Sequence, residues 1–343
     1  MAGCCGQPDR LDTGRPGGIV GMMQRNRRFF LKYLAAGAGA VGAAGWWVTA
    51  SQRRAARWLR RLARDAQRRI QPAPVQPSPG KWSDNDLTVC WIGHTTVLIN
   101  FYGIHILTDP TLGARIGIPA GLGTIGPKRF IAPALRFEEL PPIDVVLLSH
   151  AHMDHLDLPS LRRFAPETFT VTAKATLDVL TGTGLKHACE LAWNERVTFH
   201  CARGELQLEG VEVKHWGQRW PSEAPRGYNG YILKREGKAI LFGGDTARTP
   251  ALAGVRSHGP FALAIMPIGA YRPWIWNHCT PEEAVEMANA ARARYLVPVH
   301  HQTFQLSDEP ALEPLQRLEA ALDREPERIA LRRVGETFVC PRV

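Results

Sequence analysis

The sequence predicts a mixed α/β fold in which β-sheets are sandwiched between helices. Apolar runs of strand length alternate with helix-forming segments, and the alternation occurs in two similar halves. Four strand-like runs end in a metal-binding side chain, at His150, His215, Asp245 and His300. Such side chains converge when their strands share a sheet edge, so they predict a single polar site.

The first 50 residues have the pattern of an export signal. Arg27-Arg28-Phe29-Phe30-Leu31-Lys32 looks like a twin-arginine motif, and about 18 uncharged residues rich in Gly and Ala follow it. Val48-Thr49-Ala50 suits cleavage, and an uncleaved membrane anchor is the alternative. We expect residues 1–50 to engage the twin-arginine export machinery of a bacterium. The protein is then periplasmic, or held at the periplasmic side of the inner membrane, and Met22 and Met23 are alternative starts to Met1.

Residues 51–80 predict a basic helix followed by a linker. Residues 52–69 are helix-prone and strongly basic, with a thin apolar stripe that includes Trp58 and Leu62. Two interpretations stay open for this helix: it lies on an anionic membrane surface, or it is a solvated spacer. Residues 71–80 are rich in proline and predict a semi-rigid linker, so the folded domain is expected to span residues 81–343.

The basic charge belongs to the N-terminal segment. Residues 1–80 carry 14 Lys/Arg against 3 Asp/Glu, whereas residues 81–343 carry 28 against 29. A nearly neutral body argues against nucleic acid as a partner. The seven cysteines show no metal-site or redox spacing, which predicts isolated thiols and no disulfide framework.

The first half of the body predicts short strands joined by tight turns, then a long loop at residues 111–142. An apolar run at residues 143–148 predicts a buried strand, and Pro159 suits the first turn of a helix at residues 158–164. Further patterns predict a strand at residues 169–172 and a helix at residues 175–180. The early strands are expected at residues 87–92, 97–101 and 104–109.

The second half repeats the alternation. A hairpin is expected around Glu236-Gly237, and Thr280, Pro281 and Glu283 form a capping box that starts a helix. A last helix is expected at residues 309–323. The strands are expected at residues 196–200, 205–208, 211–215, 231–234, 239–242, 263–267 and 295–300.

The densest cluster of metal ligands follows the strand at residues 143–148. His150 and His152 lie on the same side of an extended segment and can hold one metal ion, while Asp154 and His155 can hold a second. His215 completes the first set and His300 the second. Asp245 is suited to bridge, because its carboxylate has two oxygens. Imidazole and carboxylate ligands suit zinc, two ions per chain, with manganese or iron as alternatives.

Two metal ions roughly 3.5–4 Å apart lower the pKa of a bridging water and stabilise the attacking and leaving oxygens. The sequence therefore predicts a hydrolase of an ester, lactone, amide or phosphodiester. Asp154 and Asp245 are expected to take part in catalysis through the metals.

The motif His150-x-His152-x-Asp154-His155 resembles the signature of the metallo-β-lactamase superfamily, which implies an αββα sandwich. Further motifs are similar to the branch of N-acyl-phosphatidylethanolamine-hydrolysing phospholipase D. They are Trp91-Ile-Gly-His-Thr-Thr, Leu107-Thr-Asp-Pro, Gly126-Pro-Lys-Arg-Phe, Leu140-Pro-Pro-Ile-Asp, Gly244-Asp-Thr, Pro267-Ile-Gly-Ala-Tyr and Pro281-Glu-Glu-Ala. The matches cover roughly residues 87–322. Departures lie at His301-Gln302 and Tyr228-Asn229-Gly230, where the family often has Trp-Gly and Trp-Gly-Ser.

The resemblance implies a zinc-dependent phosphodiesterase acting on phospholipids, with the same seven ligands. A lactonase or carboxylic-ester hydrolase is the alternative enzyme. A non-catalytic, membrane-associated metal-binding protein is the non-enzymatic alternative. The resemblance also implies a place for His278 beside the metals, in substrate contact or proton donation. The sequence leaves oligomeric state open.

Three further sets of residues receive expectations. His94 is a candidate for supporting the ligands from outside the metal shell. His301 is expected to point away from the site. Tyr271, Trp274 and Trp276 either line an apolar acyl pocket or pack their own loop.

Overall fold

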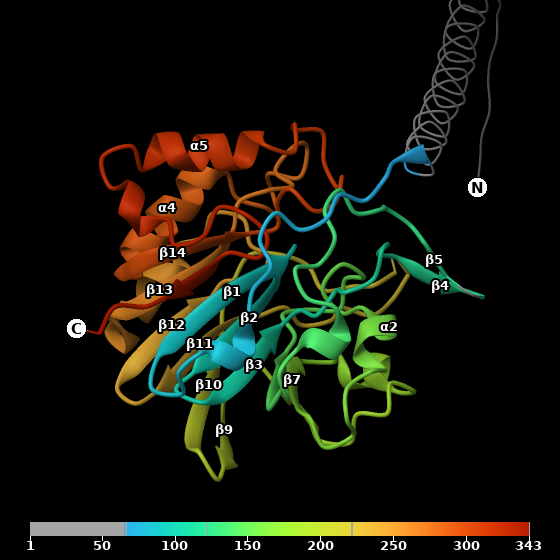
Figure 1. Ribbon diagram of the computed structural model, residues 1–343, viewed down its shortest axis with the longest axis horizontal. Coiled ribbons are helices and arrows are strands. Elements are labelled where there is room, and N and C mark those ends of the chain that lie inside the picture. Colours follow the sequence, from blue (N-terminus) through green and yellow to red (C-terminus); the bar gives the residue numbers. More distant parts are fainter. Residues whose placement is uncertain (1–64, 66, 122, 221, 343) are drawn as a thin grey trace, which may run out of the picture. The chain divides into compact units, whose positions relative to one another are not determined.

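Two mixed β-sheets face each other in the computed structural model, which describes Asp65 and residues 67–121, 123–220 and 222–342 (Figure 1). The first sheet has the order β15-β1-β2-β3-β6-β7-β8. Tight turns make β1, β2 and β3 antiparallel, whereas β3, β6, β7 and β8 run parallel. The strands are β1 (Leu87–Gly93), β2 (Thr96–Phe101), β3 (Ile104–Thr108), β6 (Val145–Leu147), β7 (Phe169–Ala173), β8 (Ala188–Leu191) and β15 (Thr337–Val339).

The second sheet has the order β14-β13-β12-β11-β10-β9. Strands β9 to β12 form an antiparallel meander, and β12, β13 and β14 run parallel. The strands are β9 (Arg196–Cys201), β10 (Gly204–Val211), β11 (Gly230–Arg235), β12 (Lys238–Phe242), β13 (Phe261–Pro267) and β14 (Ala293–Val299).

Two apolar layers hold the sheets and helices together. Residues of both sheets share one buried core, for example Trp91 and Val146 of the first sheet with Tyr231 and Leu263 of the second. A second core lies between the second sheet and helices α4 (Pro281–Ala290) and α5 (Glu313–Ala321). Figure 1 shows α4 and α5 beside β13 and β14, with α2 (Leu158–Leu161) near β7. The expected αββα sandwich is confirmed.

Where a side chain caps the start of a helix, the predicted start agrees with the structure. Thr280 Oγ1 accepts a hydrogen bond from the Glu283 backbone, and the Glu283 side chain accepts one from Thr280, so the capping box of α4 is confirmed. Asp157 caps α2, which ends at Leu161 rather than Phe164. The helix expected at residues 309–323 is α5, and it begins later, at Glu313.

For two segments the predicted type of secondary structure is wrong. Residues 175–180 form only a 3₁₀ helix, η3 (Leu177–Leu180). At its start the Glu190 carboxylate of β8 accepts hydrogen bonds from the Thr176 and Leu177 backbone N–H groups. Residues 212–215 are not a strand, since β10 ends at Val211. His215 therefore lies on a loop.

The loop expected at residues 111–142 contains short elements. They are an exposed hairpin of β4 (Ile118–Ala120) and β5 (Gly123–Ile125), and the 3₁₀ helix η2 (Phe137–Glu139). The remaining elements are η1 (Pro79–Lys81), α3 (Ala251–Gly254), η4 (Val255–His258) and η5 (Pro326–Arg328).

The proline-rich segment at residues 71–80 packs against the body, so the expected domain start near Lys81 is too late. Gln71 pairs with Ile131 in a parallel bridge, and the Val75 backbone N–H donates to the Val334 carbonyl. Arg68, at the end of the expected basic helix, stacks on the Phe130 ring at 4.2 Å.

The expected signal at residues 1–50 and most of the basic helix at residues 52–69 lie outside the described residues. Among the helices that are described, none is both long and apolar enough to cross a membrane. The described cysteines are free thiols, and Cys90 and Cys279 are buried.

Candidate metal centre

The predicted ligands meet at one end of the two sheets. His300 follows β14 directly, while His150 and Asp245 lie three residues after β6 and β12. Gly244 allows the chain to bring Asp245 into the site. Its φ is +56°, and a Cβ there would lie 2.6 Å from the Asn229 carbonyl oxygen. Only glycine accepts that conformation and contact without strain, so the chain can turn and bring Asp245 into the site.

His150, His152 and His215, the set predicted for the first metal ion, lie together in a first subsite that could hold one. His152 Nδ1 lies 2.8 Å from His150 Nε2 and 3.3 Å from His215 Nε2. Burial lowers the pKa of His150 and of His215 well below the ordinary value, and lowers that of His152 to about 4. All three imidazoles are therefore neutral near pH 7, the form that binds a metal ion.

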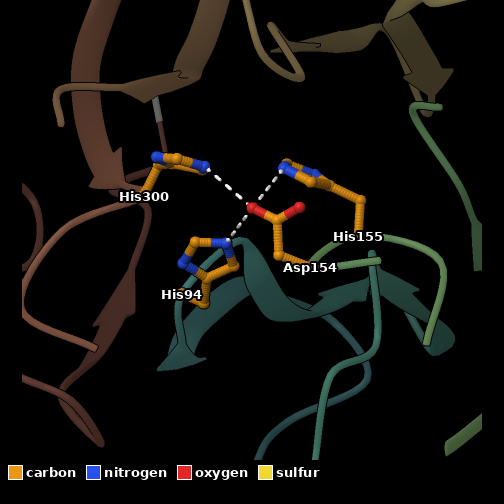
Figure 2. A group of neighbouring side chains, drawn as sticks. All are labelled: His94, Asp154, His155 and His300. Carbon is orange, nitrogen blue, oxygen red and sulfur yellow. Dashed lines mark hydrogen bonds and ion pairs between the residues drawn. The ribbon is translucent and has the colours of Figure 1, made fainter. Parts of the chain in front are cut away.

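Asp154, His155 and His300, the set predicted for the second metal ion, lie together in a second subsite that also contains His94 (Figure 2). Asp154 Oδ2 lies 3.5 Å from His155 Nε2 and 3.4 Å from His300 Nε2. Burial would raise the pKa of the Asp154 carboxyl, but the charge of His155 and the histidine hydrogen bonds hold it well below its usual value. Asp154 is thus ionised, the form in which a carboxylate can bind a metal ion.

Asp245 lies between the subsites. Its Oδ2 atom is 3.1 Å from His155 Nε2, 3.2 Å from His300 Nε2 and 3.9 Å from His215 Nε2. Burial opposes the charge on Asp245, yet the neighbouring imidazoles keep the pKa of its carboxyl well below the ordinary value. This position fits a carboxylate that bridges two cations.

Some buried atoms in the centre form no well-aligned hydrogen bond with the described residues, although two of them lie close to the Asp245 carboxylate. His155 Nε2, His300 Nε2 and Asp245 Oδ1 are buried and make no hydrogen bond with the described residues. Leaving such atoms unpaired costs free energy, and a metal ion would satisfy them. The donor set of imidazoles and carboxylates fits two ions of the zinc type.

Asp109 supports the ligands from outside, a role that the sequence analysis did not assign. Its carboxylate accepts hydrogen bonds from His155 Nδ1 at 2.7 Å and from the Ser149 hydroxyl at 2.7 Å. The Ser149 hydroxyl oxygen also lies 2.9 Å from His150 Nδ1. On the other side of the centre, the Asn277 carbonyl accepts from His215 Nδ1 at 2.8 Å. The sequence held one sign of this role: Asp109 directly follows a strand, and several of the predicted ligands also follow strands.

The structure brings two further histidines to the centre. His278 Nδ1 lies 3.8 Å from Asp245 Oδ2, beside the metals as the resemblance implied. His94 Nε2 lies 3.1 Å from Asp154 Oδ2, a contact that fits its predicted place outside the metal ligands. His301 points away as predicted, and its ring stacks on Trp91 at 4.4 Å.

A cavity of about 490 Å³ adjoins the centre. It is lined by the three residues His152, Met153 and Asp154 and by side chains of the loop after β10, namely Trp216, Gln218, Arg219 and Trp220. The Trp216 ring lies 4.5 Å from the His152 ring. The cavity therefore combines access to the ligands with an aromatic wall.

The aromatic loop before His278 divides into two parts. Tyr271 is buried and donates a hydrogen bond to Glu313, so it packs its loop. Trp274, Ile275 and Trp276 are exposed, by 48%, 40% and 76%. These three side chains leave an apolar surface beside the metal centre.

Comparison with known proteins decides the family. A family model described as a β-lactamase superfamily domain matches residues 105–301, which is more than half of the chain. The chain belongs to the β-lactamase superfamily. The matched range runs from β3 to the residue after His300, and so includes the whole predicted ligand set.

Relatives of this superfamily member include uncharacterised and named proteins. An uncharacterised protein of Mycobacterium tuberculosis is 32% identical over 282 residues, 79% of this chain and 74% of the relative. A Caenorhabditis elegans protein named N-acyl-phosphatidylethanolamine-hydrolyzing phospholipase D 1 is 31% identical over 257 residues, 70% of this chain and 71% of the relative.

The fold matches solved structures. A possible metal-dependent hydrolase from Veillonella parvula superposes with a TM-score of 0.60 at 18% identity, covering 74% of this chain and 99% of that one. This superfamily member is a metallo-β-lactamase-fold hydrolase with a candidate His/Asp metal centre.

Proposed function

We propose that the protein is a dinuclear zinc phosphodiesterase of phospholipase D type, acting on lipids similar to N-acyl-phosphatidylethanolamine. The observation that carries the proposal is the complete cluster of seven His and Asp side chains, Asp245 among them, in a chain 31% identical to the worm phospholipase D. A protein that had lost catalysis would have little reason to keep unpaired, buried ligands in this arrangement.

Different residues of the site have different roles in the proposed reaction. When bound, two metal ions supply an activated water and positive charge for the phosphoryl oxygens. Asp245 and Asp154 would help to hold the ions, and their carboxylates would offset part of the positive charge. Burial lowers the pKa of His278 to about 4, so it is neutral and its Nδ1 carries no hydrogen bond within the described residues. His278 is therefore suited to contact the phosphate, or to take a proton from the attacking water and pass it to the leaving alcohol.

In the proposed reaction, the water oxygen bonds to phosphorus and the bond from phosphorus to the N-acylethanolamine oxygen breaks. The leaving oxygen takes a proton, and the products are phosphatidate and N-acylethanolamine. Trp216 and Trp220 form one wall beside the site, and Trp274, Ile275 and Trp276 lie exposed next to His278. These apolar surfaces support a substrate with acyl chains.

A metal measurement and a substrate panel test this function. The purified protein should hold about two zinc ions per chain, and the double variant His150→Ala/His215→Ala should lose metal from the first subsite. The panel contains N-acyl-phosphatidylethanolamine, plain phosphatidylethanolamine and a lactone, with phosphatidate release as the readout. Hydrolysis of the lactone alone would assign the lactonase class instead, and an intact metal content in the double variant would refute the site.

We also propose export by the twin-arginine route and contact of residues 52–69 with an anionic membrane. The basic, helix-prone composition of that segment supports this proposal. Cell fractionation tests it: wild type should appear in the periplasmic or membrane fraction, and Arg27→Lys/Arg28→Lys should keep the protein in the cytoplasm. Equal distribution of the two would refute the export route.

A further inference from the structure

We propose that His94 is a positioning residue that holds Asp154 in place for the second metal ion. His94 Nε2 lies 3.1 Å from Asp154 Oδ2, and the His94 side chain is almost fully buried. Figure 2 shows His94 on one side of the Asp154 carboxylate, with His155 and His300 on the others. This inference rests on the proposed metal centre and is independent of the substrate.

Asp154 is the ligand that most needs support. Its side chain is 17% exposed, whereas those of His155, His300 and Asp245 are at most 2% exposed. It also borders the open cavity beside the centre. Packing therefore fixes the other ligands of this subsite, but Asp154 has room to rotate away unless a hydrogen bond fixes it.

The chemistry of the contact fixes its direction. An ionised carboxylate only accepts hydrogen bonds, so the N–H at His94 Nε2 donates and Asp154 Oδ2 accepts. An imidazole that donates from Nε2 has no lone pair on that atom for a metal ion. The geometry thus gives His94 a supporting role, while Asp154, His155 and His300 supply the ligand atoms.

The backbone of His94 is itself held rigidly. Its φ is +55°, and its carbonyl accepts hydrogen bonds from Trp91 Nε1 at 2.8 Å and from the His300 backbone N–H at 3.1 Å. Its own N–H donates to Thr303 Oγ1 at 2.9 Å. A residue in this conformation persists where its surroundings impose it. His94 therefore connects Asp154, on the loop after β6, to the loop after β14 that carries His300.

Two substitutions separate a positioning role from a ligand role. His94→Leu removes the donor, and His94→Gln keeps an N–H near the position of Nε2. Zinc dissociation constants are measured by competition with a chromophoric chelator, and cobalt(II) spectra report the ligands of each subsite. A supporting residue of this kind typically contributes 10–100-fold in metal affinity. We expect His94→Leu to weaken the second site by that factor, and His94→Gln to recover most of it with an unchanged cobalt spectrum.

Other outcomes overturn the inference. Unchanged affinity of the second site in His94→Leu would remove the role, and loss of a nitrogen ligand from the cobalt spectrum of His94→Gln would make His94 a ligand. Thermal unfolding of the metal-free variants checks folding, and His105→Leu, whose imidazole contacts the Pro142 carbonyl away from the centre, is the control. Two-site zinc binding without phosphodiesterase activity would refute the proposed function alone, because the affinities still report on His94.

Discussion

Asp109 Oδ2 lies 2.7 Å from His155 Nδ1, and both side chains are fully buried. The same carboxylate accepts hydrogen bonds from the backbone N–H and the hydroxyl of Ser149. Asp109 thereby fixes the ring of His155 and leaves Nε2 directed at the second subsite. It also connects β3 with the loop after β6.

This relationship predicts the effect of Asp109→Asn. The substitution keeps the size of the side chain but removes the charge that orients and polarises His155. We expect zinc affinity at the second subsite to fall about 10–100-fold, measured by chelator competition. Asp144→Asn is the matched control, because Asp144 also accepts a hydrogen bond from a strand backbone, that of His105, away from the centre. Equal zinc affinity in both variants would contradict the assigned role.

The metal-free protein should lose stability as the pH rises above neutrality. Burial alone would lower the pKa of His155 and His300, but Asp245 and Asp154 raise both, that of His300 to about 9. A raised folded-state pKa gives stability that is fully present below the unfolded value of 6.5 and disappears as the pH rises through 9. His300 alone contributes on the order of 3 kcal/mol over this range.

Thermal unfolding of chelator-treated protein at pH 6.5, 7.5 and 8.5 measures this effect. The histidines with lowered pKa, such as His152, act in the opposite sense and only below pH 6.5, so they do not obscure the window. Metal-free His300→Gln should show a shallower decline than wild type. A flat or rising profile for wild type would count against charged His155 and His300.

The exposed tryptophans beside the centre should matter for lipid surfaces and not for soluble substrates. Trp274→Ser/Trp276→Ser removes two indoles that are 48% and 76% exposed, so stability should change little. Indole burial at a lipid surface is worth a few kcal/mol, which predicts roughly 10–100-fold weaker vesicle binding.

Hydrolysis of vesicles and of a short-chain, monomeric phosphodiester separates the two effects. We expect the first rate to fall and the second to stay near wild type. Leu177→Ser, a substitution of a 39% exposed residue on η3, is the control and should change neither rate. An equal loss on both substrates would place these tryptophans in the catalytic site instead of on a docking surface.

The parts of the site that the sequence predicted are those encoded locally. His300 directly follows β14 and His150 lies three residues after β6, so the sequence shows that both follow apolar strands. The two strands belong to facing sheets, and the histidines converge at the same end of both. The capping box at Thr280 is likewise a local pattern. These features depend on the neighbouring residues, and the sequence shows those directly.

The unpredicted parts depend on contacts between distant segments. The hydrogen bond between His94 and Asp154 joins residues 60 positions apart. The Gln71 backbone N–H donates to the Phe130 carbonyl, and such a backbone contact produces no pattern of side chains in the sequence. The three-residue strands β4 and β5 are exposed and lack the apolar alternation that marks a half-buried strand. No local signal in the sequence carries this information.

Gly244 offers a last test of how the backbone places Asp245. Gly244→Ala puts a methyl group 2.6 Å from the Asn229 carbonyl oxygen and 2.9 Å from Ser149 Cβ, in a segment with φ of +56°. Both the conformation and the contacts oppose the substitution, so we expect a loss of well over 1 kcal/mol in unfolding free energy. We also expect weaker binding of both metal ions, because Asp245 must shift.

Gly237→Ala isolates the conformational part of this effect. Gly237 has φ of +69° on the turn between β11 and β12, and a Cβ there would meet nothing within 4 Å. This control should lose about 1 kcal/mol and keep wild-type zinc affinity. Chemical denaturation and chelator competition on both variants measure the two quantities. If Gly244→Ala behaved like Gly237→Ala, the close approach of residue 244 to Ser149 and Asn229 would not be what positions the Asp245 carboxylate.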